Sequence, residues 1–417
     1  MNNIDKITKL YSSNDDLIIR NINKIYIVFF ESLCSSKAIY DLVIKNITDY
    51  IKLNKKINNI ENVISSPKLL KSNSLNESIN YLENGFCLVI YNDIVYAVET
   101  KADLDRGINQ SNTEVSMYGP KDSFCENYQK NLGLLKRKIK TTNLKQQSYY
   151  IGYSSKELVT LFYLDNKCDK KYIKSIEEKL NKLHSNINNT DILFNLFNKS
   201  ILFPTILKSE KPSTCSDFLL DGYVVLMIDN SPFCLILDVP LIKIINHQTH
   251  DSFVKILRIV CLILTILTPA IYLSLIRFHT GLIPTRLLVN LINQRLSVPF
   301  PSLIEALLML FVCEILRETD IRFPNYYGSA SSILGALILG DAAVNAGIVS
   351  PIMIIIIAIT FITSLIFTET KFVASIRILR VIFLLSASLT GLYGITFLLI
   401  LLIIYLKKVK LNKGRYL

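Results

Sequence analysis

The sequence predicts a multidomain protein in which two related α+β subdomains precede a polytopic α-helical membrane domain. We expect about four to six membrane helices, including broken or re-entrant segments. Three observations predict this class. The 417-residue chain changes near residue 250 from a Lys/Asn/Ser-rich composition to successive apolar runs long enough to cross a bilayer. A strand–helix–hairpin order occurs twice in the first part. Prolines, glycines and ionisable residues interrupt the apolar runs of the second part.

The positive charge of the chain is concentrated in its apolar part. From Phe253 onward there are 15 Lys/Arg against 6 Asp/Glu, which places +9 of the formal +12 there. Basic residues beside apolar spans favour anionic headgroups and set the orientation of the spans. The surplus therefore predicts a lipid membrane as partner and gives no support for nucleic acid. Residues 1–25 contain no apolar signal segment, so we expect the first part to stay on the cytoplasmic side.

Nothing in the sequence supports catalysis. The eight cysteines are scattered without a CxxC pair, and the four histidines do not cluster. We find no nucleophile–base arrangement, P-loop or dinucleotide fingerprint. The expectation is a protein that is not an enzyme and that has no metal site and no cofactor.

The first part reads as a duplicated module. Its first copy is the strand Ile25–Phe30, the helix Lys37–Leu53 and the hairpin Gly85–Glu99. The same order returns as Leu158–Leu164, Lys170–Leu183 and Gly222–Leu237. Leu82-x-x-Gly85-Phe86 and Leu219-x-x-Gly222-Tyr223 align without gaps. The alternative is a chance resemblance of two hairpins, because short strand patterns are easily misread.

A helix that begins at Asp122 or Ser123 is expected between the two copies. Apolar residues at helical spacing define one face: Phe124, Tyr128, Leu132, Leu135 and Ile139. The opposite face is basic: Lys130, Lys136, Arg137, Lys138 and Lys140. That face either rests on an anionic surface or partner or is simply solvated. The expected domains are 1–117, 118–250 with the linking helix, a transmembrane domain at 251–410 and a short cytoplasmic tail at 411–417.

The apolar part offers at least four candidate spans: Ile259–Ile276, Pro301–Leu316, the adjoining pair Ser331–Val344 and Ile348–Phe367, and Val381–Leu406. Prolines predict the positions where helices break: Pro284, Pro299, Pro301, Pro324 and Pro351. We interpret Glu314, Arg317 and Glu318, on one helix face, as a structural ion cluster whose members pair among themselves. Contact with a ligand is the alternative for this cluster.

Four small residues recur at every fourth position: Gly328, Ser332, Ala336 and Gly340. Such a stripe lets helix backbones approach closely. Asp341 follows it, and an acid at membrane depth marks either an ion pathway or a hydrogen bond at a helix end. We assign helix packing to Gly328, Gly335, Ala336 and Gly347, and the candidate ion path to Ser332, Gly340, Asp341 and Asn345.

Several short motifs, in one order, resemble the A subunit of the nutrient germinant receptors of bacterial endospores, the GerA family. They are Tyr118-Gly119-Pro120-Lys121-Asp122-Ser123-Phe124, Phe203-Pro204-Thr205, Leu282-Ile283-Pro284-Thr285, Val298-Pro299-Phe300-Pro301 and Gly347-Ile348-Val349-Ser350-Pro351. The sequence departs from the family at Tyr118, at Thr319-Asp320, at Asp341 and at Asn345. The last two, four residues apart, suit an acid–amide pair that keeps the local charge.

This resemblance implies a domain of two subdomains in the spore core and a membrane domain in the spore inner membrane. It also implies a transporter-like B subunit and a lipoprotein C subunit as partners, and a homo-oligomeric A subunit that opens a cation path when a nutrient germinant binds. The alternatives are a transporter-like subunit or a scaffold without its own pore. Broken helices suit a transporter, but the apolar part has fewer spans than a transporter alone would need.

Overall fold

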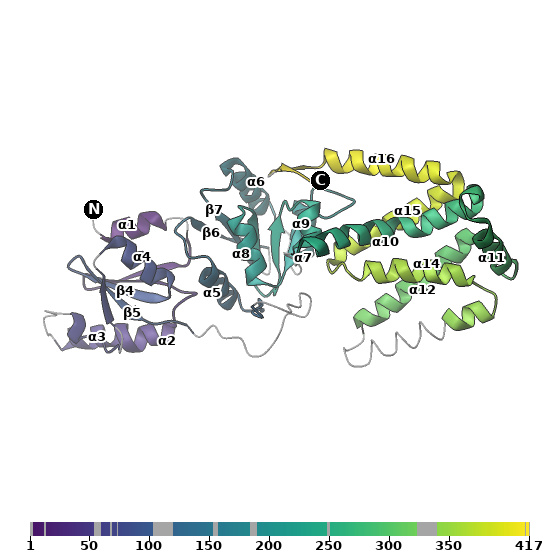
Figure 1. Ribbon diagram of the computed structural model, residues 1–417. Helices are drawn as coiled ribbons and strands as arrows, with labels where there is room; N and C mark the ends of the chain where they lie inside the picture. Colours follow the sequence, from purple (N-terminus) through teal and green to yellow (C-terminus); the bar gives the residue numbers. More distant parts are fainter. Residues whose placement is uncertain are drawn as a thin grey trace. The chain divides into compact units, whose positions relative to one another are not determined.

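The computed structural model describes all residues except 1–2, 12–13, 54–59, 67–68, 73, 103–119, 153–156, 184–189, 248–250, 323–339, 413 and 417. The chain forms two compact units. The N-terminal unit comprises Met1–Lys199 and Thr205–Val239, and the helical unit comprises Ser200–Pro204 and Pro240–Leu417. Figure 1 shows two sheets in the former and the long helices in the latter.

The first half of the N-terminal unit is an antiparallel sheet between two helical layers. Its strands have the order β1-β2-β4-β5-β3. Neighbouring residues of β2 face opposite layers, with Ile27 packing beside Val43 and Val28 beside Leu82. The elements are α1 Asn3–Leu10, β1 Leu17–Ile22, β2 Ile25–Phe30, α2 Ser36–Ile39, a π-helical turn Tyr40–Ile44, α3 Lys45–Lys52, a 3-10 turn Ile60–Asn62, β3 Leu69–Ser72, α4 Leu75–Glu83, β4 Phe86–Tyr91 and β5 Ile94–Glu99.

The second half repeats this topology. Its antiparallel sheet has the order β6-β7-β9-β10-β8, which is the same arrangement of first, second, fourth, fifth and third strands. The duplication predicted from the sequence is therefore confirmed. The elements are α5 Tyr128–Lys138, β6 Leu144–Ile151, β7 Glu157–Leu164, α6 Lys170–Asn181, α7 Thr190–Phe197, β8 Leu207–Ser209, α8 Pro212–Leu220, β9 Val224–Ile228 and β10 Cys234–Leu237.

The two glycines that align in the sequence have the same backbone conformation. Gly85 follows α4 with φ +80°, and Gly222 follows α8 with φ +81°. Both end a helix in the left-handed region, which favours glycine because it has no Cβ. The thiol of Cys34 donates to the Gly85 carbonyl at 3.4 Å, and that of Cys168 donates to the Gly222 carbonyl at 3.3 Å. The repeat thus extends to individual contacts.

The linking helix begins later than the sequence predicts. It starts at Tyr128, where the Asn127 side chain accepts a hydrogen bond from the Lys130 N–H and caps the helix. Before that point, the Phe124 N–H donates a hydrogen bond to the Glu210 carbonyl at 2.7 Å. This backbone group therefore bonds to a distant residue and not within a helix. The basic face is also not uniformly solvated, because Lys136 is buried.

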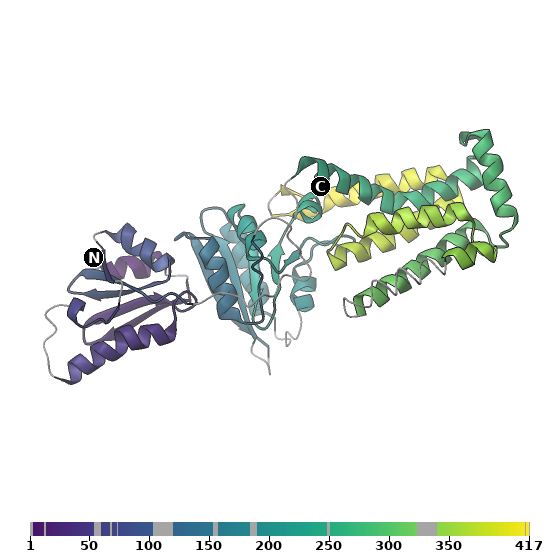
Figure 2. The same cartoon turned by 60° about the horizontal axis from the view of Figure 1, so that its bottom comes forward.

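The helical unit consists of long helices, seen from two directions in Figures 1 and 2. Its longest helix, α10, packs chiefly against α15 and α14. The described elements are α9 Leu241–Asn246, α10 Ser252–Phe278, a 3-10 turn Thr280–Leu282, α11 Thr285–Leu296, α12 Ser302–Arg322, α14 Pro351–Ser364, α15 Thr370–Thr390, α16 Leu392–Lys408, β11 Lys410–Leu411 and β12 Gly414–Arg415.

Among the described helices, α10 and α15 are long and apolar enough to cross a membrane, and α14 is a shorter apolar helix. Core helices of soluble proteins share these properties, so the number of crossings stays a prediction. The run Val381–Leu406 is not one span. Gly391, at φ +67°, separates α15 from α16, and a Cβ there would lie 3.1 Å from side-chain atoms of Phe278 and His279.

Four of the five prolines lie where described helices begin. Pro284 directly precedes α11, Pro299 and Pro301 lie between α11 and α12, and Pro351 is the first residue of α14. Proline lacks an N–H, and the first turn of a helix leaves that group without an intrahelical acceptor anyway. Pro324 lies outside the described residues.

Candidate functional site

Polar side chains meet inside the helical unit at two places. At the first, Glu305 in the opening turn of α12 is 1% exposed. Its Oε1 accepts a hydrogen bond from the Ser350 N–H at 2.6 Å and another from the Ser350 hydroxyl. The first turn of a helix favours an anion, but the direct donors to Glu305 come from the turn before α14.

At the second place, Glu314 of α12 pairs with two arginines of α15. It lies 3.0 Å from Arg377 Nε and 3.1 Å from Arg380 Nη2. Arg380 is buried, so this carboxylate neutralises a cation that would otherwise be costly. The sequence pattern predicts pairing within 314–318 and does not indicate either arginine as a partner. The signal available in the sequence was the spacing of Arg377 and Arg380, three residues apart beside an apolar run, which places both on one helix face.

Arg317, the second member of the predicted cluster, turns toward α14. Its guanidinium donates to the Ser364 hydroxyl and lies 5.4 Å from the centre of the Phe361 ring. These contacts join the end of α12 to the end of α14. Glu318, the third member, lies on the same helix and also interacts with other groups. The arrangement supports a structural role for this region.

The candidate ion path is described only in part. Gly340, Asp341 and Asn345 lie in a short helical stretch before the turn at Gly347, and the Asn345 amide donates to Asp341 Oδ2 at 3.2 Å. Both side chains are exposed in the single chain. Four of the other assigned residues lie outside the described residues: Gly328, Ser332, Gly335 and Ala336.

Gly347 makes the turn between this helical stretch and α14 possible. Its φ is +64°, and a Cβ at this position would lie 2.9 Å from the Ser297 carbonyl oxygen after α11. This close approach brings the turn beside the start of α12, where Ser350 meets Glu305. Asp341 therefore lies near an end of the helical unit.

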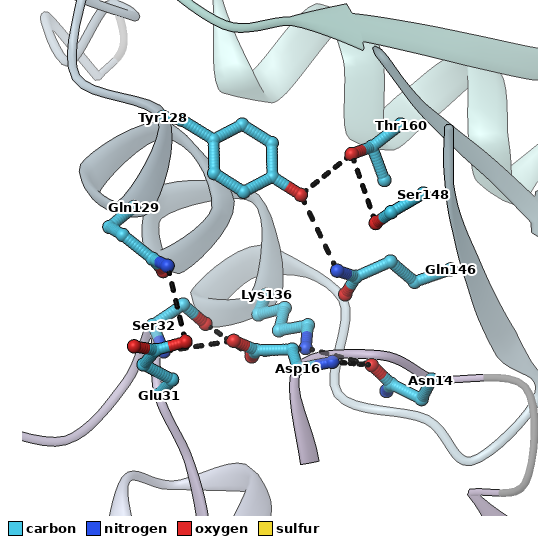
Figure 3. A network of polar contacts seen from close by, with 10 residues as sticks. All are labelled: Asn14, Asp16, Glu31, Ser32, Tyr128, Gln129, Lys136, Gln146, Ser148 and Thr160. Atoms are coloured by element: carbon cyan, nitrogen blue, oxygen red, sulfur yellow. Dashed lines mark hydrogen bonds and ion pairs between the residues drawn. The ribbon is translucent and has the colours of Figure 1, made fainter. Parts of the chain in front are cut away.

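A network of polar side chains joins the two halves of the N-terminal unit (Figure 3). Lys136 Nζ lies 2.6 Å from Asp16 Oδ2, and the two side chains are 5% and 2% exposed. The Ser32 N–H and hydroxyl donate to the same carboxylate at 3.1 and 2.6 Å. The Lys136 ammonium also lies 4.2 Å from the centre of the Phe30 ring. This pair is not predicted by the sequence pattern.

Burial lowers the pKa of Lys136, and the Asp16 carboxylate opposes that shift. A cavity of about 20 Å³ lies beside the network, lined partly by Tyr11, Glu83 and Lys136. Burial also raises the pKa of Glu83, whose carboxylate accepts a hydrogen bond from the Tyr11 hydroxyl at 2.9 Å. The cavity has room for about one water molecule.

The segment Ser200–Pro204 is bound within the helical unit although it interrupts the sequence of the N-terminal unit. The Tyr405 hydroxyl, at the end of α16, accepts from the Ile201 N–H at 3.1 Å and lies 3.1 Å from the Ser200 hydroxyl. The Tyr416 hydroxyl donates to the Pro204 carbonyl at 2.8 Å. Residues 411–417, expected to be a short cytoplasmic tail, therefore include the buried side chain of Tyr416, which is bonded to this segment.

Comparisons with known proteins identify the relatives of this chain. The family model described as Bacillus/Clostridium GerA spore germination protein matches residues 5–417. Spore germination protein KA of Bacillus subtilis (strain 168) is 30% identical over 97% of this chain and 78% of its own length. Spore germination protein A1 of the same strain is 29% identical over 97% and 86%, and GerLA of Bacillus cereus is 30% identical over 94% and 84%.

Among solved structures, the N-terminal domain of the A subunit of the Bacillus megaterium spore germinant receptor GerK3 matches with a TM-score of 0.42 and 22% sequence identity. The match covers 56% of this chain and 92% of that domain. The family model, by contrast, spans both units described above. Together with the curated relatives, it shows that the chain belongs to the GerA family of spore germination proteins.

Proposed function

We propose that this chain is the A subunit of a nutrient germinant receptor and that its helical unit provides a path for monovalent cations. The observation that supports the receptor role is the GerA match over residues 5–417. We further propose that it acts with B and C subunits in the spore inner membrane, with the N-terminal unit on the core side. The concentration of basic residues beside the apolar helices agrees with that orientation.

Asp341 is the residue that supports the cation path. It is exposed in the single chain, within an apolar unit, and among the described residues its side chain is hydrogen-bonded to Asn345 alone. An ionised acid that faced lipid would be costly, so we expect it to face water or another subunit. Its position near an end of the helical unit favours the mouth of a path, where a ring of acids attracts cations.

A homo-oligomer would bring one Asp341 from each subunit together. No described atom lies within 4 Å of a Cβ built on Gly340, so this end of the small-residue stripe has open space in the single chain. We propose that a second copy of the chain packs there. Close approach of two helices needs small side chains at their interface.

Gly340→Leu should therefore reduce the yield of the homo-oligomer without unfolding the subunit, because its side chain would occupy the space that a neighbouring helix needs. The matched control is Gly281→Leu, which also has open space around its Cβ but lies off the stripe. Native mass spectrometry of the detergent-purified protein measures the stoichiometry. Wild-type stoichiometry in the Gly340 variant would exclude packing at this position.

The receptor role is tested by gene deletion and complementation in the organism that makes this protein. Spores without the gene should lose the response to one class of nutrient and keep the responses of their other receptors. Complementation with the wild-type gene should restore it. An unchanged response to every nutrient tested would contradict the proposal.

A transporter-like subunit is the second candidate, and the interruption between Asn345 and Pro351 favours it. Broken helices of this kind expose backbone groups that bind substrates and ions at membrane depth. The two candidates differ in what crosses the membrane. Accumulation of labelled nutrient without a cation current would support the transporter, whereas a current without accumulation would support the channel.

A further inference from the structure

The helical unit contains a buried carboxylate whose hydrogen bonding is incomplete. Glu305 is 1% exposed, and only its Oε1 is satisfied, by two bonds from Ser350. Its Oε2 is buried without a hydrogen-bond partner in the described part of the protein. Native proteins satisfy most buried polar atoms, so an oxygen left in this state indicates a missing partner.

Tyr272 of α10 contributes a second oxygen of the same kind. Its hydroxyl is buried and makes no hydrogen bond of normal geometry among the described residues. It lies close enough to Ser350, Glu305 and Arg295 to interact with them electrostatically. Tyr272 also packs in one cluster with Ala306 and Val349, the chain neighbours of Glu305 and Ser350, so the two unpartnered oxygens belong to the same buried region.

The surroundings of these oxygens are apolar. Tyr272 packs in a cluster with residues of three other helices: Ala306, Met309, Leu310, Met353 and Leu384. Desolvation disfavours an isolated carboxylate in such an environment. The helices α14 and α15 contribute the uncharged Met353 and Leu384 to this cluster, and α11 contributes Arg295 at longer range.

Arg295 does not satisfy the carboxylate. No ion pair joins it to Glu305 among the described contacts, and its Nε is itself buried without a hydrogen-bond partner. The partner of Oε2 then comes from the solution, and a bound cation supplies the opposite charge that an isolated buried carboxylate lacks. Carboxylate and hydroxyl oxygens are suitable ligands for an alkali-metal ion.

We propose that Glu305 Oε2, the Tyr272 hydroxyl and the Ser350 hydroxyl form an exchangeable site for one alkali-metal ion. An alkali-metal ion is coordinated by these oxygens, with water completing the shell. The choice of monovalent cations rests on the proposed function, but the site is defined by these contacts.

Occupation of the site should stabilise the helical unit, because the site joins α10, α12 and the turn before α14. A ligand that binds only the folded state raises its stability in proportion to the logarithm of ligand concentration. The melting temperature is therefore a readout of binding that needs no transport. Failure of this inference and failure of the proposed function are separate results.

The experiment compares the full-length wild-type protein in detergent with the Glu305→Gln variant. Melting is measured in KCl or NaCl against N-methylglucamine chloride of equal ionic strength at fixed pH. We expect the wild-type melting temperature to rise with KCl or NaCl. The Glu305→Gln variant should show no such rise.

The matched control is Glu314→Gln, which removes a carboxylate of the same helix that is paired with Arg377 and Arg380. It should melt at a lower temperature and keep the wild-type dependence on KCl or NaCl. A wild-type protein without that dependence, or a Glu305→Gln variant that keeps it, would overturn the site.

If Glu305→Gln fails to fold, Tyr272→Phe tests the same site, because it keeps the aromatic ring and removes one ligand oxygen. It should shift the half-maximal salt concentration relative to the wild type. An unchanged half-maximal concentration would overturn the site. Absence of nutrient-triggered cation flux, together with an intact ion-dependent stability, would instead contradict the proposed function and leave the site standing.

Discussion

Lys136→Met should destabilise the joint between the two halves of the N-terminal unit by about 3–5 kcal/mol, because it leaves the buried Asp16 carboxylate without its cation. Met matches the apolar part of the lysine side chain and does not replace the charge. The remaining donors to Asp16 come from Ser32, at 3.1 and 2.6 Å. Two bonds from neutral donors do not offset the loss of an ammonium at 2.6 Å.

The appropriate measurement is hydrogen exchange in the full-length protein, because a chain of two units does not unfold in one step. Amides of α5 and of β6 should exchange faster in Lys136→Met. Lys130→Met, on the exposed side of the same helix, is the control and should change protection little. The double variant Asp16→Asn with Lys136→Met should recover part of the loss. If Lys136→Met and Lys130→Met leave these amides equally protected, the Lys136–Asp16 pair does not stabilise the joint.

Tyr416→Ala should release the segment Ser200–Pro204 from the helical unit. Tyr416 is 0% exposed, and deletion of a large buried aromatic side chain costs about 3–5 kcal/mol. Its hydroxyl donates to the Pro204 carbonyl, and its own carbonyl accepts from the Leu241 N–H at 3.0 Å. The ring of Phe203, in the same segment, lies 5.4 Å from the Phe372 ring, measured between centroids. Loss of Tyr416 should therefore weaken the packing of Phe203 against Phe372.

Limited proteolysis of the full-length protein tests this expectation, with cleavage near residues 199–205 as the readout. Tyr416→Phe separates the two contributions, since it removes only a hydrogen bond worth about 1 kcal/mol. Tyr393→Ala is the control, because Tyr393 is 78% exposed. Wild-type resistance to cleavage in Tyr416→Ala would mean that this residue does not hold the segment.

The sequence predicted the duplicated module because local signals repeat at matching positions. Gly85 and Gly222 are each preceded by a helix and followed by a buried hairpin, and the fold requires a left-handed residue at both. The first strand of each sheet was missed, since β1 contains Arg20 and Asn21, and polar residues are frequent in β6. Their partners in the sheet hold these strands in place, which local propensity does not show.

Contacts between residues far apart in the chain could not be predicted from local sequence patterns. Lys136 and Asp16 are 120 residues apart, and each alone reads as a solvated charge. Gly391 looked like one of several small residues in an apolar run, yet its positive φ ends α15 and separates Arg377 and Arg380 from the last helix. Family membership was predicted from motifs in order and is confirmed by the family match, whereas the assigned ion-path residues stay predictions.

Nutrient-triggered cation flux through receptors that carry Asp341 substitutions tests the central claim most directly. The assembled receptor is placed in liposomes or assayed in spores, with protein levels matched to the wild type. Asp341→Asn should lower the flux and Asp341→Lys should abolish it, because an acid at the mouth of the path concentrates cations. If Asp341 serves only the hydrogen bond with Asn345, Asn should substitute almost fully, since its carbonyl also accepts that bond. Unchanged flux in Asp341→Asn would contradict the account.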